Sequence, residues 1–175
     1  MPLKPHLGLL CTLLPFAAGA ATPYVELRAY PAGGIASAGV LFPRGSHLEL
    51  GISALYNRAE RGDAGKHDDE SGDGVGIGIE ARRYHRSART GWFHGARAEM
   101  FRLDIDWRDA GNRRGNSEIT VLQPTARIGY RFAPIRPGAS LELAAGLGAE
   151  INLETDGEKV GEGAIGLVGV ALRFD

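Results

Sequence analysis

The chain has 175 residues, a formal net charge of −1 and hydrophobic residues at 43% of its positions. Its balance of 20 basic and 21 acidic residues excludes the strongly basic surface that nonspecific nucleic-acid binding requires. The single cysteine excludes a disulfide framework, and no apolar run after residue 20 reaches the ~20 residues of a spanning helix. Any membrane-spanning form must therefore be a closed barrel, because only helices and closed barrels satisfy every backbone group in lipid.

Residues 1–20 have the pattern of a secretory signal peptide. A short basic start precedes an apolar run over 7–18, and Ala18 and Ala20 supply the small residues that precede cleavage. Cys11 follows a leucine, where a lipoprotein signal needs a small residue, so we expect Cys11 to be removed with the peptide. The mature chain would then begin at residue 21.

Eight later segments have strand-like patterns. They cover residues 23–31, 34–43, 47–58, 73–85, 91–106, 117–132, 139–153 and 163–174. Each is near or above the ~9–11 residues with which a β-strand crosses a bilayer. An even number of such strands is typical of bacterial outer-membrane barrels.

The alternation within these segments predicts which side chains face outward. In 47–58, Leu48, Leu50 and Ile52 alternate with polar or small residues, and from Leu141 to Leu153 every odd position is apolar. Two irregularities interrupt the pattern. In 91–106 the apolar phase shifts by one position after Met100, which predicts a β-bulge there. Pro124 cannot donate a ladder hydrogen bond, which predicts a local defect in the sixth strand.

The connections alternate in length and polarity. Residues 43–46, 85–90 and 133–138 are short turns, whereas residues 57–72, 106–116 and 154–162 are long, charged loops. The connection near residues 32–34 is tight although it lies on the long-loop side. Short turns on one rim and long loops on the other are typical of periplasmic and outer rims. We therefore predict an all-β fold: an eight-stranded antiparallel up-and-down transmembrane β-barrel over 21–175, located in the cell outer membrane and preceded by a signal peptide over 1–20.

The end of the chain carries a resemblance. The last segment, apolar at every second position and reaching Phe174, resembles the C-terminal signature of bacterial outer-membrane β-barrels, although Asp175 follows it. The phrases Glu-Ala-Arg-Arg-Tyr, Gly-Trp-Phe-His-Gly-Ala, Ile-Gly-Tyr-Arg-Phe and Leu-Glu-Leu-Ala-Ala-Gly-Leu-Gly resemble the OmpA/OmpX-like eight-stranded barrel superfamily. This resemblance implies that Phe174 is an assembly signal read by the outer-membrane assembly machinery. It implies no enzymatic activity.

Aromatic residues gather near the ends of the predicted strands, which predicts interfacial girdles. The residues concerned are Tyr24, Tyr30, Phe42, Tyr56, Tyr84, Trp92, Phe93, Trp107, Tyr130, Phe132 and Phe174.

The inward positions carry six acids and six bases. This predicted lumen charge network comprises Glu26, Glu49, Glu80, Glu99, Glu142 and Glu150 with Arg28, Arg82, Arg97, Arg127, Arg131 and Arg173. An eight-stranded barrel is barely wide enough for its own side chains, and paired buried charges are tolerable where isolated ones are not. We interpret the lumen as a packed polar core. The alternative is a narrow channel for ions or small solutes.

No catalytic, cofactor or metal site is predicted. His85-Arg86-Ser87 is superficially similar to the His-x-Ser stretch of outer-membrane lipid A deacylases, but it lacks the following Asn and falls in a predicted periplasmic turn. An acidic stretch over 63–73 lacks the ligand rhythm of a calcium loop and is interpreted as solvated.

We therefore expect a structural or surface-interaction role, with a channel as the alternative and a lipid A hydrolase as the least supported reading. The expected partners are outer-membrane lipids and lipopolysaccharide. We expect no enzyme activity and no nucleic-acid partner, and we expect a monomer.

Overall fold

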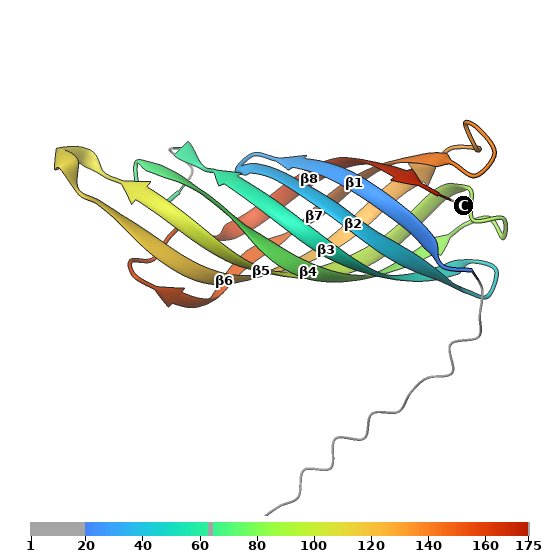
Figure 1. The fold of residues 1–175 in the computed structure, drawn as a ribbon, viewed down its shortest axis with the longest axis horizontal. Helices are drawn as coiled ribbons and strands as arrows, with labels where there is room; N and C mark the ends of the chain where they lie inside the picture. The colour runs from blue at the N-terminus through green and yellow to red at the C-terminus, as the bar shows by residue number, and fades with distance from the viewer. Residues whose placement is uncertain (1–19, 63–64, 175) are drawn as a thin grey trace, which may run out of the picture.

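In the computed structural model, residues 20–62 and 65–174 are described, and they form a closed ring of eight antiparallel strands (Figure 1). The strands are β1 (Thr22–Tyr30), β2 (Gly33–Arg44), β3 (Leu48–Glu60), β4 (Asp69–Tyr84), β5 (Gly91–Arg108), β6 (Arg114–Arg131), β7 (Ser140–Asp156) and β8 (Gly163–Arg173). Each strand pairs with the next along the chain, and β8 closes the ring against β1. The predicted up-and-down barrel is confirmed.

The described part of the chain contains no helix that is long and apolar enough to span a bilayer. Most of the predicted signal peptide, including Cys11, lies outside the described residues, as do Asp63 and Asp175.

The barrel is longer on one side than the sequence predicts. Strands β4 to β7 have 16, 18, 18 and 17 residues, compared with the ~9–11 that cross a bilayer. Strands therefore extend into two predicted loop segments: β5 and β6 take up all of 106–116 except residues 109–113, and β7 continues into 154–162 as far as Asp156. A single-turn η2 (Ala110–Asn112) closes the β5–β6 hairpin. Figure 1 shows this hairpin extending beyond the others, at the end opposite the C-terminus. We call this end of the barrel the outer extension.

The tight β1–β2 connection has a steric origin. Tyr30 pairs directly with Gly33, which leaves only Pro31 and Ala32 in the turn. Gly33 has a φ of +140°, and a Cβ atom there would collide with the Arg58 carbonyl on β3. Only glycine meets both conditions.

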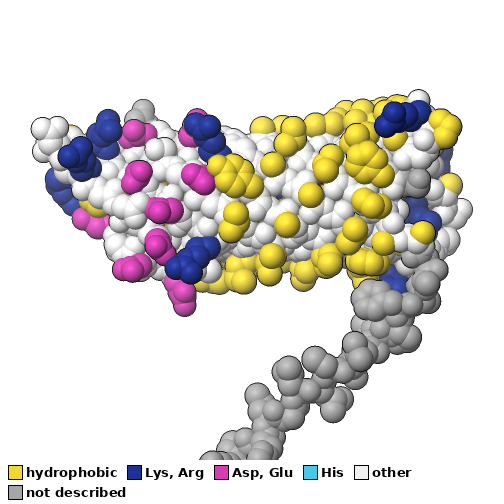
Figure 2. All heavy atoms as spheres, viewed as in Figure 1, with side chains coloured by type: hydrophobic (Ala, Val, Ile, Leu, Met, Phe, Trp, Pro, Cys, Tyr) yellow, Lys and Arg dark blue, Asp and Glu magenta, His cyan; other side chains and the backbone are white. Residues whose placement is uncertain are grey.

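The outward face carries a continuous apolar band. Its members include Leu27, Ile52, Ile77, Ile79, Leu147 and Val168, each more than half exposed. Figure 2 shows hydrophobic side chains covering the half of the barrel nearer the C-terminus and charged side chains covering the outer extension. An apolar exterior of this extent is a lipid-facing surface, since soluble proteins rarely expose such patches.

The predicted β-bulge near Met100 is wrong. Strand β5 pairs without a register shift along both β4 and β6, and its side chains alternate regularly. Phe101 and Leu103 point into the barrel, whereas Arg102 and Asp104 point outward. The apolar phase shifts because the strand leaves the lipid at this point. Before Met100 in the sequence the apolar face of β5 is outside, and after Met100 the apolar face is inside.

The defect predicted at Pro124 is confirmed on one side of β6. The ladder to β7 omits Gln123 and Pro124, although both residues pair with β5. A register shift follows at Thr120/Val121, where Leu153 is the additional residue of β7.

The aromatic residues divide into two groups, so the predicted girdles are only partly correct. Trp92, Tyr130 and Phe132 point outward and stack edge to face, at centroid distances of 5.3 and 5.0 Å. Phe174 is likewise exposed near the same rim. Five others are buried inside: Tyr24, Tyr30, Tyr84, Phe93 and Trp107. Inward and outward rings alternate with strand parity, which position near a strand end does not reveal.

The outer extension has its own apolar core inside the barrel. It contains Tyr30, Ile35, Leu55, Ala59, Phe101, Leu103, Ile105, Trp107, Ile119, Val121, Val160, Ile165 and Leu167. We call this cluster the apolar plug. It lies between the charged lumen and the outer loops, and its outermost members on β5, Ile105 and Trp107, lie where the exterior of the barrel is polar.

Candidate functional site: the charged lumen

All twelve residues of the predicted lumen network are buried inside the barrel. Ten of them form one connected set, in which five glutamates and five arginines alternate as neighbours. These are Glu26, Glu49, Glu80, Glu99 and Glu142 with Arg28, Arg82, Arg97, Arg127 and Arg173. They come from every strand of the barrel except β2.

The periplasmic part of the network is centred on Arg82 and Arg173, both fully buried. The Arg82 guanidinium donates to Glu80 at 2.7 and 2.9 Å and to Glu142 at 2.6 Å. Arg173 donates to Glu49 at 2.8 and 2.9 Å and to Glu142 at 2.7 Å. Charge-assisted bonds of this kind offset the large cost of desolvating each ion.

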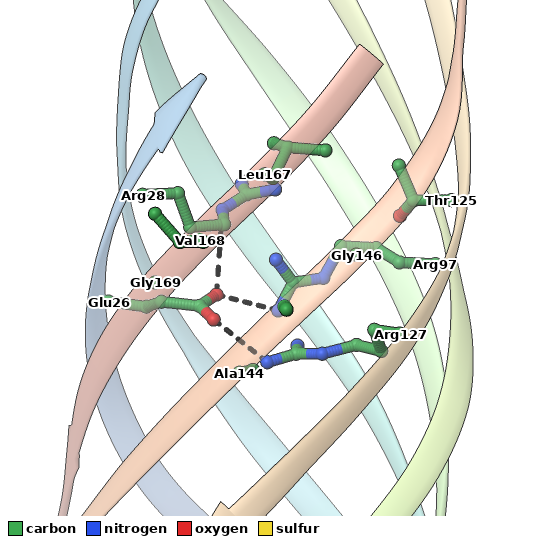
Figure 3. Close-up of a pocket in the computed structure, with 11 residues that line it drawn as sticks. Glu26, Arg28, Arg97, Thr125, Arg127, Ala144, Gly146, Leu167, Val168 and Gly169 are labelled. Atoms are coloured by element: carbon green, nitrogen blue, oxygen red, sulfur yellow. Dashed lines mark hydrogen bonds and ion pairs between the residues drawn. The ribbon is translucent and has the colours of Figure 1, made fainter. Parts of the chain in front are cut away.

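The middle of the network is centred on Glu26. Figure 3 shows its carboxylate between three arginines, and Arg97 and Arg127 approach it at 2.6 and 2.9 Å. Arg28 lies 3.6 Å from Glu26 and makes a two-bonded pair with Glu99, at 2.7 Å for each bond.

The cavity among these side chains has a volume of about 20 Å³. It has room for about one water molecule. The side chains thus fill the lumen at this level.

Two predicted members lie apart from the connected set. Glu150 pairs with Arg61 at 2.7 Å near the outer loops. Arg131 donates to the Ser140 hydroxyl at 3.0 Å and to the Arg89 carbonyl at 2.9 Å, at the periplasmic end.

Two tyrosines complete the network, and both were expected at the membrane surface. Tyr24 donates its hydroxyl to Glu80 at 2.8 Å, and Tyr84 donates to Glu142 at 2.8 Å. The Arg82 guanidinium also lies 5.2 Å from the Tyr24 ring centroid, within cation–π range. Each inward tyrosine thus supplies an apolar ring and one polar bond to a carboxylate.

A second buried site, at the outer extension, was missed by sequence reasoning. Glu70 was expected in a solvated loop, but it is buried and accepts hydrogen bonds from the backbone N–H groups of Lys66, His67 and Gly161. Arg61 joins Glu70 at 3.0 Å to Glu150 at 2.7 Å. Sequence reasoning missed the burial of Glu70, because an acid among other acids in a polar segment gives no sign that its side chain points inward.

The local environment sets the protonation of Glu70. Burial alone would raise the pKa of this carboxyl, but the backbone N–H groups of Gly161 and Lys66 and the Arg61 guanidinium lower the pKa below its ordinary value. As a carboxylate, Glu70 therefore ties Arg61 and the backbone at Lys66 and His67 to the backbone at Gly161.

Replacing Glu70 by Gln should loosen both outer segments, by about 1–3 kcal/mol for the lost charge-assisted bonds. Because the folded pKa is depressed, the stabilisation is present above the ordinary pKa of ~4.3 and is lost as pH falls through the folded value. Amide hydrogen exchange at Gly161 should accelerate in Glu70→Gln. The exposed Glu60, paired with Arg58 at the end of β3, provides the control Glu60→Gln. Equal exchange in both variants would contradict the assignment.

The described residues contain no group of three or more His, Cys, Asp or Glu placed to hold a metal ion. The charged lumen fills one part of the barrel interior with paired charges, and the apolar plug fills the part nearer the outer loops.

No protein-family model matches the chain, and no curated protein sequence matches it. Solved structures are similar to it. The N-terminal β-barrel domain of Pseudomonas aeruginosa OprF aligns at a TM-score of 0.52 and 18% identity, covering 88% of this chain and 96% of that one. Acinetobacter baumannii CarO aligns at 0.50 and 12%, with 88% and 96% coverage. Neisserial surface protein A has a TM-score of 0.47 at 13% identity, with 88% and 93% coverage.

The first two likenesses show the fold. Fold and surface together define the class: a small eight-stranded β-barrel of the bacterial outer-membrane type, with an apolar band outside and paired charge inside. The resemblance of the sequence to small outer-membrane barrels is confirmed at the level of the fold.

Proposed function

We propose that this chain is an integral outer-membrane barrel with a closed lumen and a structural or surface-interaction role. The proposal rests on one observation: two separate layers of side chains close the interior of the barrel. The connected charge network fills the membrane-spanning part, and the apolar plug fills the outer extension. A conducting pathway would have to pass through both.

The outer extension supports the surface-interaction part of the proposal. Its exterior is polar and charged, and its interior is packed, so it presents a rigid folded surface rather than loose loops. Its partners would include the headgroups of lipopolysaccharide, whose phosphates arginines bind well. Phe174, exposed beside β1, is the proposed signal for the assembly machinery.

A non-enzymatic role belongs to the same proposal. The imidazole of His85 lies against His94, with ring nitrogens 3.4 Å apart, and among the described residues Ser87 makes no hydrogen bond with it. A serine nucleophile needs its base within hydrogen-bond reach.

Reconstitution into planar bilayers tests the closed lumen. The unmodified protein should show no steady conductance, because the ions would have to displace paired charges and then cross the apolar plug. A large steady conductance in the unmodified protein would contradict the proposal and favour the channel.

A further inference from the structure

A groove runs along the lipid-facing side of strands β3 to β6. Its volume is about 670 Å³, and its walls include Leu50 and Ile79. Small side chains form its floor, because Ala81, Ala96 and Ala126 lie directly opposite one another on three neighbouring strands. Larger apolar side chains surround this floor, so the apolar band is recessed here.

The periplasmic end of the groove is cationic. The next outward residues after Ala81 and Ala96 are Arg83 and His94, which are exposed and directly opposite each other in the β4–β5 ladder. Within residues 20–62 and 65–174, the Arg83 guanidinium makes no hydrogen bond or ion pair with another side chain. A charged group at the edge of the lipid-facing surface needs an anion or water as its partner.

We propose that this groove binds one glycerophospholipid of the periplasmic leaflet. Part of an acyl chain would lie over the alanine floor, and the phosphate would be held by Arg83 with His94. Arginine matches phosphate oxygens with two parallel N–H donors, and each methylene that lies on the alanine floor adds van der Waals contact. The inference rests on the proposed membrane location, with the short turns on the periplasmic side.

Charge selects this occupant over a second copy of the chain. At the periplasmic ends of the neighbouring strands, the described outward residues include Leu48 on β3, Trp92 on β5, Tyr130 on β6 and Leu143 on β7, and none of these is an acid. Another copy that meets the groove with this rim therefore offers Arg83 no carboxylate from these residues. A phospholipid offers a phosphate at that level.

The barrel also provides an internal control. A second outward groove of about 660 Å³ is lined by Val25, Leu27, Ala36, Ala38 and Tyr56, among others. The next outward residues at its periplasmic end are Pro23, Val40 and Ile52, none of which is charged. The two grooves have similar volumes, but within the described part of the chain only the first has a cationic residue at its periplasmic end.

The test uses the full-length barrel folded in detergent and titrated with phosphatidylglycerol, with bound lipid counted by native mass spectrometry. The wild-type protein should bind one lipid saturably. Arg83→Gln and Ala96→Leu should each weaken this binding about tenfold, the loss expected for one charge-assisted bond or a filled groove. Arg136→Gln, in the exposed turn 132–138, and Ala38→Leu, in the second groove, should leave it unchanged.

Each alternative outcome has its own reading. Equal lipid binding in all five proteins would overturn the proposal, since the lipids would then be nonspecific. A dimer abolished by Ala96→Leu, with lipid binding unaffected, would assign the groove to a second copy. Heat-modifiable gel migration of every variant shows whether the barrel is folded. If all variants are folded but bind lipid equally, the lipid-binding proposal fails, whereas the proposed function as a closed barrel is unaffected.

Discussion

Replacing Arg82 by Met should destabilise the folded barrel by about 3–5 kcal/mol, the cost of stranding a buried charge. Arg82 is fully buried and donates to two carboxylates, Glu80 and Glu142. In this variant Glu80 retains Arg97 and Arg127, and Glu142 retains Arg173. Each glutamate nevertheless loses its shortest bond to an arginine, which is the bond to Arg82. Urea unfolding of the detergent-folded protein measures the effect.

The matched control is Arg102→Met. Arg102 also pairs with a glutamate at 2.7 Å, but both side chains are more than half exposed on the outer extension. Exposed pairs contribute little, so this variant should unfold as the wild type does. Comparable losses of unfolding free energy in the two variants would show that burial does not determine how much these ion pairs stabilise the barrel.

A double-mutant cycle on Arg28 and Glu99 separates pairing from burial. This pair is the most self-contained part of the network, with two bonds of 2.7 Å. Arg28→Met and Glu99→Gln together should cost less than the two single changes added, by about 0.5–3 kcal/mol. Strictly additive losses would mean that the two side chains act independently.

Replacing Leu147 by Arg should impair membrane insertion by about 2–4 kcal/mol, the cost of an arginine at the lipid-facing midplane of a barrel. Leu147 is 74% exposed in the middle of the apolar band on β7. The yield of folded barrel in lipid vesicles measures insertion.

Asp156→Arg is the control on the same strand. Asp156 is exposed on the outer extension and lies opposite Glu118, so an arginine there relieves a like-charge contact. This variant should insert normally. Normal insertion of Leu147→Arg as well would refute the assignment of the outward face to lipid.

The alternation of apolar residues was enough to predict the fold. Period two, strand number and the lengths of the connections determine an up-and-down barrel, and the inward acids and bases follow from strand parity. The same parity placed Glu26, Arg82 and Arg127 inside, where the structure has them.

The outer extension was not predicted, because the rule used to assign faces reverses there. Period-two alternation alone assigns the apolar face of each strand to the outside. Above Met100 the solvent is water on the outside, so Phe101 and Ile105 turn inward without any bulge. Glu70 was missed for a related reason, since its burial depends on the distant Arg61 and Gly161.

The cross-strand contact of Arg97 with Glu80 was expected, but most of the partners across the lumen lay beyond sequence reasoning. Parity places a side chain inside, but it does not say which carboxylate a long arginine reaches across the barrel. Arg28 pairs with Glu99 from the opposite side of the ring, and Glu150 pairs with Arg61 rather than with the main network.

This chain folds as a closed barrel whose outer face meets lipid. Gel migration of unheated and boiled samples from the outer-membrane fraction tests it most directly, because a folded barrel resists detergent until it is heated. We expect the unheated protein in that fraction to migrate differently from the boiled protein. Identical migration of both samples, or recovery of the protein in the soluble fraction, would contradict the account.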